Sequence, residues 1–213
     1  MSLRRYLSEM PLVAILRGLK PEEAPDAFAV LVEAGFRVIE VPLNSPRPLE
    51  TIAYMSEHAG AGLLIGAGTV LSVEEVLPAA QAGARLMVAP NCDPAVIAAA
   101  EAHRMATLPG VATPSEAFAA IKAGADGLKL FPGELLPPAA LKAWRAVLPA
   151  GTLMLPVGGI TLANMADYVA AGAGGFGIGS ALYKPGMAAS ALEGRARAFV
   201  KRCRELFPAI PGA

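Results

Sequence analysis

Short apolar runs alternate along the chain with longer segments that have helical spacing. The apolar runs cover residues 13–18, 36–43, 63–70, 86–91, 105–110, 127–132, 153–159 and 175–180. Apolar runs of this length, bounded by glycine, proline or charged residues, are typical of buried β-strands. The pattern therefore predicts eight strands.

The segments between these runs carry the signals of helix starts and ends. Pro21-Glu22-Glu23 begins one segment, Ser72 and Glu75 have the spacing of a capping box, and Ser115-Glu116 and Thr161 precede two more. The dipeptide Ala-Gly recurs where these segments end, and glycine readily takes the left-handed conformation that follows a helix. The chain is thus predicted to repeat a strand–helix unit.

Eight consecutive strand–helix units predict an α/β fold of the (β/α)8 TIM-barrel type, with residues 1–213 as a single domain. The strands are too apolar to leave one face exposed, which favours a closed parallel barrel. An open, doubly wound sheet is the alternative. Its glycine-rich fingerprint is expected after the first strand, and the sequence there, ILRGLKPEEA, does not have it.

Composition narrows the range of partners and locations. The chain has 54% hydrophobic and 17% charged residues, and its 18 Lys and Arg balance its 18 Asp and Glu. No net field favours nucleic acid or an acidic membrane surface as a partner. No apolar stretch approaches the roughly 20 residues that span a bilayer. Two distant cysteines, Cys92 and Cys203, and a start without an apolar signal core predict a cytoplasmic protein without a disulfide.

Candidate functional residues collect where the predicted strands end, which is where barrels of this type hold their active sites. They are Arg17, Glu40, Thr69, Pro90, Asn91, Thr113, Lys129, Gly158, Gly159, Gly179 and Ser180. Side chains alternate between the two faces of a strand. Glu40 therefore shares a face with Val38, and Lys129 lies opposite Leu128 and Leu130, so both charged groups are predicted to point into the barrel mouth.

A lysine in the middle of an apolar strand needs a counter-charge, or its altered proton affinity has a use. One interpretation is a buried ion pair between Lys129 and Glu40 that stabilises the barrel. The other is catalytic. A lysine amine that is neutral part of the time attacks a ketone to form a Schiff base, whose protonated imine allows the adjacent carbon–carbon bond to break. Glu40 is the candidate general acid and base for that chemistry.

The remaining candidates divide between binding and structure. Gly158-Gly159 and Gly179-Ser180 end the last two predicted strands, where barrels frequently bind phosphate with backbone amides; ordinary turns are the alternative. Arg17 is either a rim salt bridge or, with Thr69, an anchor for a carboxylate. Pro90, Asn91 and Thr113 either shape loops or contact substrate. The two histidines, His58 and His103, lie in helical segments, so no metal site is expected.

The motifs AILRG, VIEVPLNSP, IGAGTVL, VAPN, LPGVATPSEA, LKLFPGE, PVGGI and GIGSALY together resemble those of the 2-keto-3-deoxy-6-phospho-aldonate aldolases. The similarity runs over about residues 11 to 202. The resemblance implies a homotrimeric class I aldolase on a (β/α)8 barrel, without metal or other cofactor. Such an enzyme cleaves a phosphorylated keto-deoxy sugar acid to pyruvate and glyceraldehyde 3-phosphate.

The resemblance also implies individual roles. Lys129 of LKLFP becomes the Schiff-base lysine and Glu40 of VIEVPL the general acid and base. Arg17 and Thr69 become substrate contacts near the pyruvyl end. Gly158, Gly159, Gly179 and Ser180 become the phosphate site.

One position differs within the family. Phosphogluconate-type members have an arginine four residues after the glutamate, whereas this chain has Asn44. The asparagine form resembles the phosphogalactonate branch, so Asn44 is a candidate substrate contact. The two substrates differ only in configuration at C4, and use of both is compatible with the sequence.

Two other classes of protein remain as alternatives. A phosphate-binding barrel isomerase or epimerase shares the late glycines, but its metal-dependent form needs histidine and aspartate ligands at strand ends. A non-catalytic sugar-phosphate binding protein keeps the phosphate site and tolerates the loss of Lys129. Trapping with borohydride and pyruvate distinguishes them, since only the aldolase forms an imine.

Overall fold

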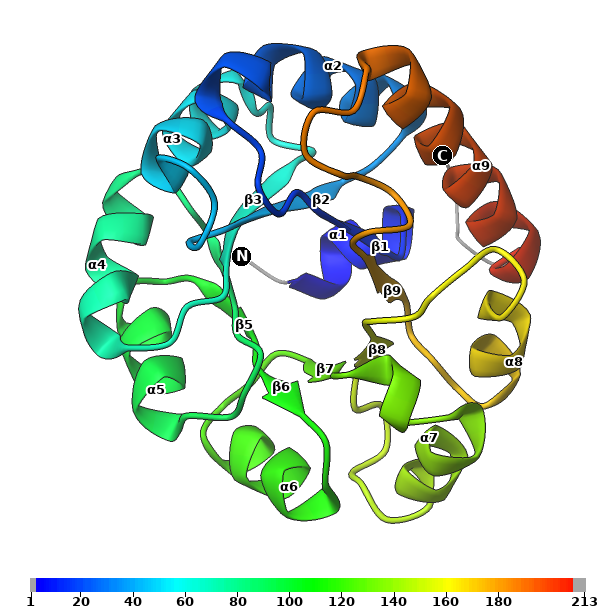
Figure 1. Cartoon of the computed structure of the whole chain (residues 1–213). Coiled ribbons are helices and arrows are strands. Elements are labelled where there is room, and N and C mark those ends of the chain that lie inside the picture. Colours follow the sequence, from blue (N-terminus) through cyan, green and yellow to red (C-terminus); the bar gives the residue numbers. More distant parts are fainter. Residues whose placement is uncertain (1–2, 209–213) are drawn as a thin grey trace.

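The computed structural model describes residues 3–208, which form a ring of parallel strands surrounded by helices (Figure 1). The strands are β1 (Leu12–Ile15), β2 (Val38–Pro42), β3 (Leu64–Gly68), β4 (Leu86–Val88), β5 (Ala106–Leu108), β6 (Gly110–Val111), β7 (Leu128–Leu130), β8 (Met154–Pro156) and β9 (Phe176–Ile178). Each of the eight predicted apolar runs overlaps a strand.

The helices alternate with the strands after an initial helix. They are α1 (Leu3–Glu9), α2 (Ala24–Ala34), α3 (Pro48–His58), α4 (Val73–Gln81), α5 (Pro94–Ala102), α6 (Pro114–Lys122), α7 (Pro138–Arg145), α8 (Met165–Ala170) and α9 (Ala189–Leu206), with the 3-10 turns η1 (Pro21–Glu23) and η2 (Gly133–Leu135). None of the helices in residues 3–208 is long and apolar enough to cross a membrane.

Local sequence signals set several of these boundaries. Glu75 accepts a hydrogen bond of 3.2 Å from the backbone N–H of Ser72, which holds the first turn of α4. Gly35 ends α2 with φ of 110°, a conformation in which a side chain is strained. The predicted capping box and the predicted glycine stop are therefore confirmed at these helices.

The expectation of one closed, eight-stranded (β/α)8 TIM barrel is wrong. Hydrogen bonds divide the described strands into a six-stranded sheet in the order β5-β4-β3-β2-β1-β9 and a three-stranded sheet in the order β6-β7-β8. The predicted fifth strand is split at Pro109 into β5 and β6, because proline has no N–H to donate to a neighbouring strand. On the other side, β8 and β9 are connected by an isolated bridge between Val157 and Gly177. The fold is a curled, barrel-like arrangement of parallel strands.

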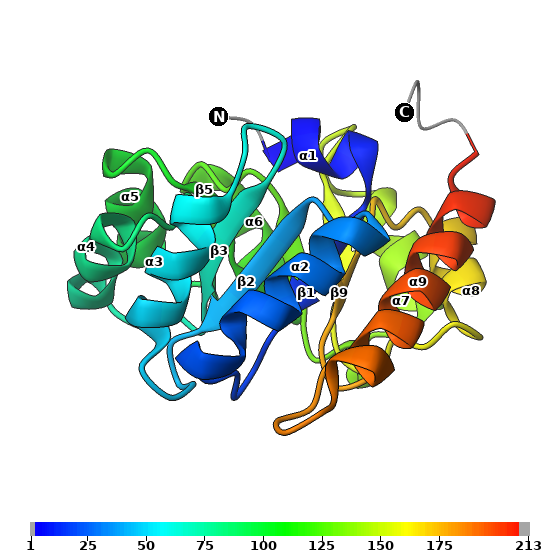
Figure 2. The same cartoon turned by 90° about the horizontal axis from the view of Figure 1, so that it is seen from above.

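Two apolar clusters fix which end of the ring is open. The larger cluster lies between the strands and the outer helices and includes Ile39, Val41, Leu128 and Leu130. The smaller one fills the inside of the ring, where Leu3, Tyr6 and Leu7 of α1 pack with the first residues of several strands, including Val13, Val38, Leu64 and Leu86. Helix α1 thus covers the amino ends of the strands (Figure 2). The site must lie at the carboxyl ends.

Candidate active site

Glu40 and Lys129 both face the inside of the ring. Val38 belongs to the inner cluster and Ile39 and Val41 to the outer one, so Glu40 of β2 points inward. The neighbours of Lys129 on β7, Leu128 and Leu130, both pack in the outer cluster, which leaves Lys129 on the inner face. The two-residue alternation of the sequence predicts this placement.

Burial alters the proton affinity of both groups. Glu40 is 1% exposed and Lys129 is 4% exposed, and Oε2 of Glu40 has no hydrogen-bond partner. Loss of hydration raises the pKa of Glu40 against the opposing charges of Lys129 and Arg17. The same cause lowers the pKa of Lys129, helped by the charge of Arg17 and opposed by that of Glu40. Both shifts favour a neutral amine beside a neutral carboxyl.

This protonation pattern suits nucleophilic chemistry. Lys129 Nζ lies 4.9 Å from the centroid of the Phe131 ring. A neutral amine is a nucleophile, whereas an ammonium is not. A carboxyl with a raised pKa keeps its proton to higher pH, so it can act as a general acid as well as a base. The alternative, a buried ion pair that stabilises the barrel, is not observed: no direct ion pair joins Glu40 and Lys129 within residues 3–208.

Gly68 at the end of β3 makes room for the Glu40 side chain. A Cβ atom on Gly68 would overlap the Glu40 carboxylate, and its distance to Oε1 would be 3.2 Å. Sequence reasoning did not single out Gly68. The only signal was its place in IGAGTV at a strand end, and glycines at such positions usually serve a turn.

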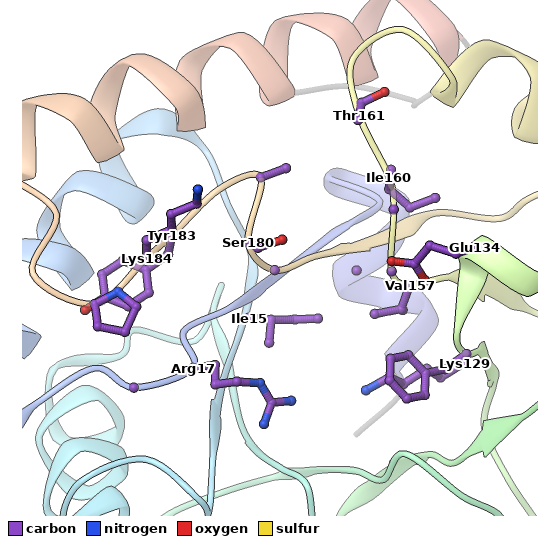
Figure 3. A pocket seen from close by; sticks show the side chains of 18 residues that line it. Ile15, Arg17, Lys129, Glu134, Val157, Ile160, Thr161, Ser180, Tyr183 and Lys184 are labelled. Atoms are coloured by element: carbon purple, nitrogen blue, oxygen red, sulfur yellow. The ribbon is translucent and has the colours of Figure 1, made fainter.

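One cavity of about 530 Å³ brings half of the predicted site residues together (Figure 3). Six of the predicted residues line it: Arg17, Lys129, Gly158, Gly159, Gly179 and Ser180. In Figure 3, Lys129 reaches into the cavity from one side, while Arg17 and Ser180 approach from the other. Glu40 does not line the cavity itself. Its charge interacts with those of Lys129 and Arg17, which do.

The glycine-rich end of the cavity offers free hydrogen-bond donors. Gly158 and Gly159 have φ of 98° and 64°, which bend the backbone after β8 into the cavity. Within residues 3–208 the backbone N–H groups of Gly159, Gly179 and Ser180 donate no hydrogen bond, whereas that of Gly158 faces β9 at the bridge between Val157 and Gly177. Unused N–H groups that line a cavity together are suited to bind an anion.

Arg17 is held by two side chains from neighbouring strand ends. Its Nη1 donates a hydrogen bond of 2.8 Å to Oδ1 of Asn44, and its Nη2 donates one of 3.5 Å to Oγ1 of Thr69. Asn44 and Thr69 do not line the cavity themselves. They orient the guanidinium that does, so their link to a ligand runs through Arg17.

Pro90 and Thr113 also lie outside the lining of the cavity. Thr113 caps α6: its Oγ1 accepts a hydrogen bond of 3.3 Å from Glu116 N–H, and Glu116 Oε2 accepts one of 2.9 Å from Thr113 N–H. The backbone of Pro90 packs so closely against Gly110 that a Cβ atom there would overlap it. Their roles as substrate contacts stay predictions.

The cavity is also lined by residues that sequence reasoning missed. Glu134, Thr161, Tyr183 and Lys184 line it together with the predicted residues. Glu134 directly follows the LKLFPG segment, and that adjacency was the available signal. Within residues 3–208 no group of three or more His, Cys, Asp or Glu side chains is arranged to hold a metal ion.

A ring of parallel strands with a buried lysine of lowered pKa and a buried carboxyl of raised pKa at its carboxyl end fits an aldolase, a carbon–carbon lyase. A family model described as KDPG and KHG aldolase matches residues 3–193. The chain belongs to this family, as its motifs predict.

Individual relatives narrow the comparison. The chain is 54% identical over 188 residues to the probable 2-dehydro-3-deoxy-6-phosphogalactonate aldolase of Rhizobium meliloti, covering 88% of this chain and 89% of that protein. It is 42% identical over 201 residues to the 2-dehydro-3-deoxy-6-phosphogalactonate aldolase of Escherichia coli, covering 94% and 98%. A solved structure described as "Native KDPGal structure" superposes with a TM-score of 0.92 at 42% identity, covering 94% of this chain and 97% of that one.

Proposed function

We propose that the protein is a class I aldolase that cleaves 2-dehydro-3-deoxy-6-phosphogalactonate to pyruvate and glyceraldehyde 3-phosphate, with the phosphogluconate epimer as a second substrate. The observation that carries the proposal is a single cavity with the Lys129 amine and a group of unused backbone N–H donors. The names of two similar aldolases support the choice of C4 epimer.

In this proposal the reaction begins with attack of the neutral Lys129 amine on the C2 ketone. Loss of water gives a protonated imine. A base then removes the proton of the C4 hydroxyl, the C3–C4 bond breaks, and its electron pair moves into the imine to give an enamine. Glyceraldehyde 3-phosphate leaves, C3 takes up a proton, and water releases pyruvate from Lys129.

Glu40 supplies the proton transfers of this sequence. Its raised pKa lets the carboxyl give a proton when water is lost from the first adduct and take one when the C4 hydroxyl reacts. Arg17, oriented by Asn44 and Thr69, holds the C1 carboxylate with a charge-assisted hydrogen bond. The phosphate lies against Gly158, Gly159, Gly179 and Ser180, and the N–H groups of Gly159, Gly179 and Ser180 donate hydrogen bonds to it.

The direct test is covalent trapping. Pyruvate with borohydride should reduce the imine to a stable adduct, which peptide mass analysis should locate at Lys129. Lys129→Arg should abolish both trapping and cleavage, since a guanidinium does not deprotonate in proteins. Lys142→Arg, on the exposed surface of α7, is the matched control and should behave like the parent. Trapping that persists in Lys129→Arg would assign the imine to another lysine, and absence of trapping in the parent would favour the binding-protein or isomerase alternatives.

We further propose that the enzyme is a cytoplasmic homotrimer. Leu71 is 51%, Val73 44% and Leu77 46% exposed, and they form an apolar surface on and just before α4 that association would cover. Both cysteines are free, which suits a reducing compartment. Sedimentation equilibrium tests the assembly: a trimer in the parent and a smaller species in Leu77→Glu would support it, and a parent monomer would reject it.

A further inference from the structure

Glu134 is the only carboxylate among the described residues that line the cavity. It lies on η2, directly after the strand that carries Lys129. In Figure 3 the Glu134 side chain enters the cavity from the same side as Lys129 and ends near the backbone that follows Val157. The proposed reaction gives it no task.

Close packing places this carboxylate at the edge of the proposed phosphate site. A Cβ atom on Gly159 would lie 2.8 Å from Glu134 Cγ, and one on Gly158 would overlap Glu134 Oε2. The Glu134 side chain therefore lies directly on the Gly158-Gly159 turn, and the two glycines leave it the space.

The backbone beneath Glu134 is held firmly. Gly133 N–H donates a hydrogen bond of 2.7 Å to the carbonyl of Val157. The Tyr168 hydroxyl reaches both ends of η2, at 3.1 Å from the carbonyl oxygen of Gly133 and 3.2 Å from that of Leu136. A side chain mounted on such a fixed turn has a defined place relative to Lys129 and to the phosphate site.

The carboxylate has no partner of its own. No hydrogen bond or ion pair within residues 3–208 involves the Glu134 side chain. An ionised carboxylate only accepts hydrogen bonds, so a ligand must bring donors to it. A phosphate dianion has no donor and is repelled, whereas a hydroxyl group donates. The chemistry at this point of the cavity thus fits a sugar hydroxyl.

We infer that Glu134 accepts a hydrogen bond from the C5 hydroxyl of the substrate, the hydroxyl next to the phosphate-bearing carbon. The inference rests on the proposed function, in which C2 is bound to Lys129 and the C6 phosphate lies at Gly158, Gly159, Gly179 and Ser180. C3 has no hydroxyl and the C4 hydroxyl reacts with the base. The C5 hydroxyl is the donor nearest to the phosphate, and Glu134 is the acceptor nearest to the phosphate site.

The test compares two aldehydes in condensation with pyruvate. Glyceraldehyde 3-phosphate carries the hydroxyl in question, whereas 3-oxopropyl phosphate lacks it and keeps the phosphate. The parent should prefer the hydroxylated aldehyde in kcat/KM by about tenfold or more, the usual effect of a hydrogen bond to a charged group. Glu134→Ala should reduce this ratio to near one. Glu134→Gln keeps an acceptor oxygen and should restore part of it.

Glu57→Ala, on the exposed end of α3, is the matched control and should leave the ratio unchanged. A Glu134→Ala variant that loses rate equally with both aldehydes would overturn the inference and make Glu134 a structural residue. An equal increase in rate with both aldehydes would also overturn the inference, because the carboxylate would then act only by repelling phosphate.

Pyruvate trapping by borohydride separates this inference from the proposed function. Trapping needs Lys129 but no aldehyde, so it should be normal in both Glu134 variants. Normal trapping with an unchanged aldehyde ratio overturns the role of Glu134 alone. Absence of trapping in the parent would overturn the proposed function, and the inference with it.

Discussion

The Glu40 carboxylate occupies the space in which a side chain at Gly68 would begin. The two residues lie on neighbouring parallel strands, with Glu40 paired to Gly66 and Pro42 paired to Gly68 in the register of β2 and β3. A Cβ atom at Gly68 would overlap the Glu40 carboxylate, so the carboxylate needs this room. The alternation of β2 directs Glu40 inward, and the glycine leaves the space that its carboxylate occupies.

Gly68→Ala is expected to displace Glu40 from its place beside Lys129. Turnover should fall by roughly 10²–10⁴, about the worth of a positioned acid or base, and overpacking should cost about 1–3 kcal/mol of stability. Steady-state kinetics and thermal unfolding measure the two effects. Gly62→Ala, where a Cβ atom meets nothing within 4 Å, is the control. Full activity in Gly68→Ala would show that Glu40 does not depend on this space.

Glu40→Gln keeps the shape of the side chain and removes its proton transfer. Cleavage should fall by roughly 10²–10⁴, while the imine with pyruvate should still form, more slowly, because the nucleophile is intact. Rapid-quench cleavage and borohydride trapping separate the two steps. Normal rates in both would leave Glu40 with a structural role.

The pH dependence of imine formation should report the shifted pKa of Lys129. Burial lowers this pKa below its ordinary value of 10.5, so the neutral amine, and with it the trapping rate, should reach its plateau at a lower pH than for an exposed lysine. The Glu40 charge opposes the shift. Glu40→Gln should therefore move the profile to still lower pH. A half-maximal pH at or above 10.5 in the parent, or an upward shift in the variant, would contradict this reading of the site.

The sequence predicts the inward placement of Glu40 and Lys129 because a two-residue alternation is a local property of a strand. The sequence does not predict how the ring of strands closes. Pro109 divides the predicted fifth strand into β5, which pairs with β4, and β6, which pairs with β7. The connection of β8 to β9 is reduced to one bridge between Val157 and Gly177. Continuity of a sheet depends on pairing between distant segments, which apolar runs do not encode.

The same limit applies to the site. Arg17, Gly158 and Ser180 are found from their positions at strand ends, and the structure brings them to one cavity. Gly68 and Glu134 are missed because their significance lies in a contact with a residue far along the chain. Thr113 is a different case. It was selected for its position near a strand end, and the structure shows that its side chain caps the following helix.

Asn44→Arg is expected to change the preference between the two C4 epimers. Asn44 accepts a hydrogen bond from Arg17 Nη1, so an arginine here removes that acceptor and places a second cation beside the first. The guanidinium of Arg17 should move, and the electrostatic field around C4 of the substrate should change. The phosphate donors follow β8 and β9, away from Asn44, so phosphate affinity should stay nearly constant.

The measurement is the ratio of kcat/KM for the two epimers in the parent and in Asn44→Arg, since specificity is a difference of transition-state free energies. A change of about tenfold, or about 1.4 kcal/mol, is expected. Asn44→Ala removes the acceptor without adding charge and so separates the two causes. A ratio that changes only in Asn44→Arg assigns the effect to the new cation. A ratio that changes equally in both variants assigns it to the release of Arg17. An unchanged ratio in folded, active variants would reject position 44 as the discriminator.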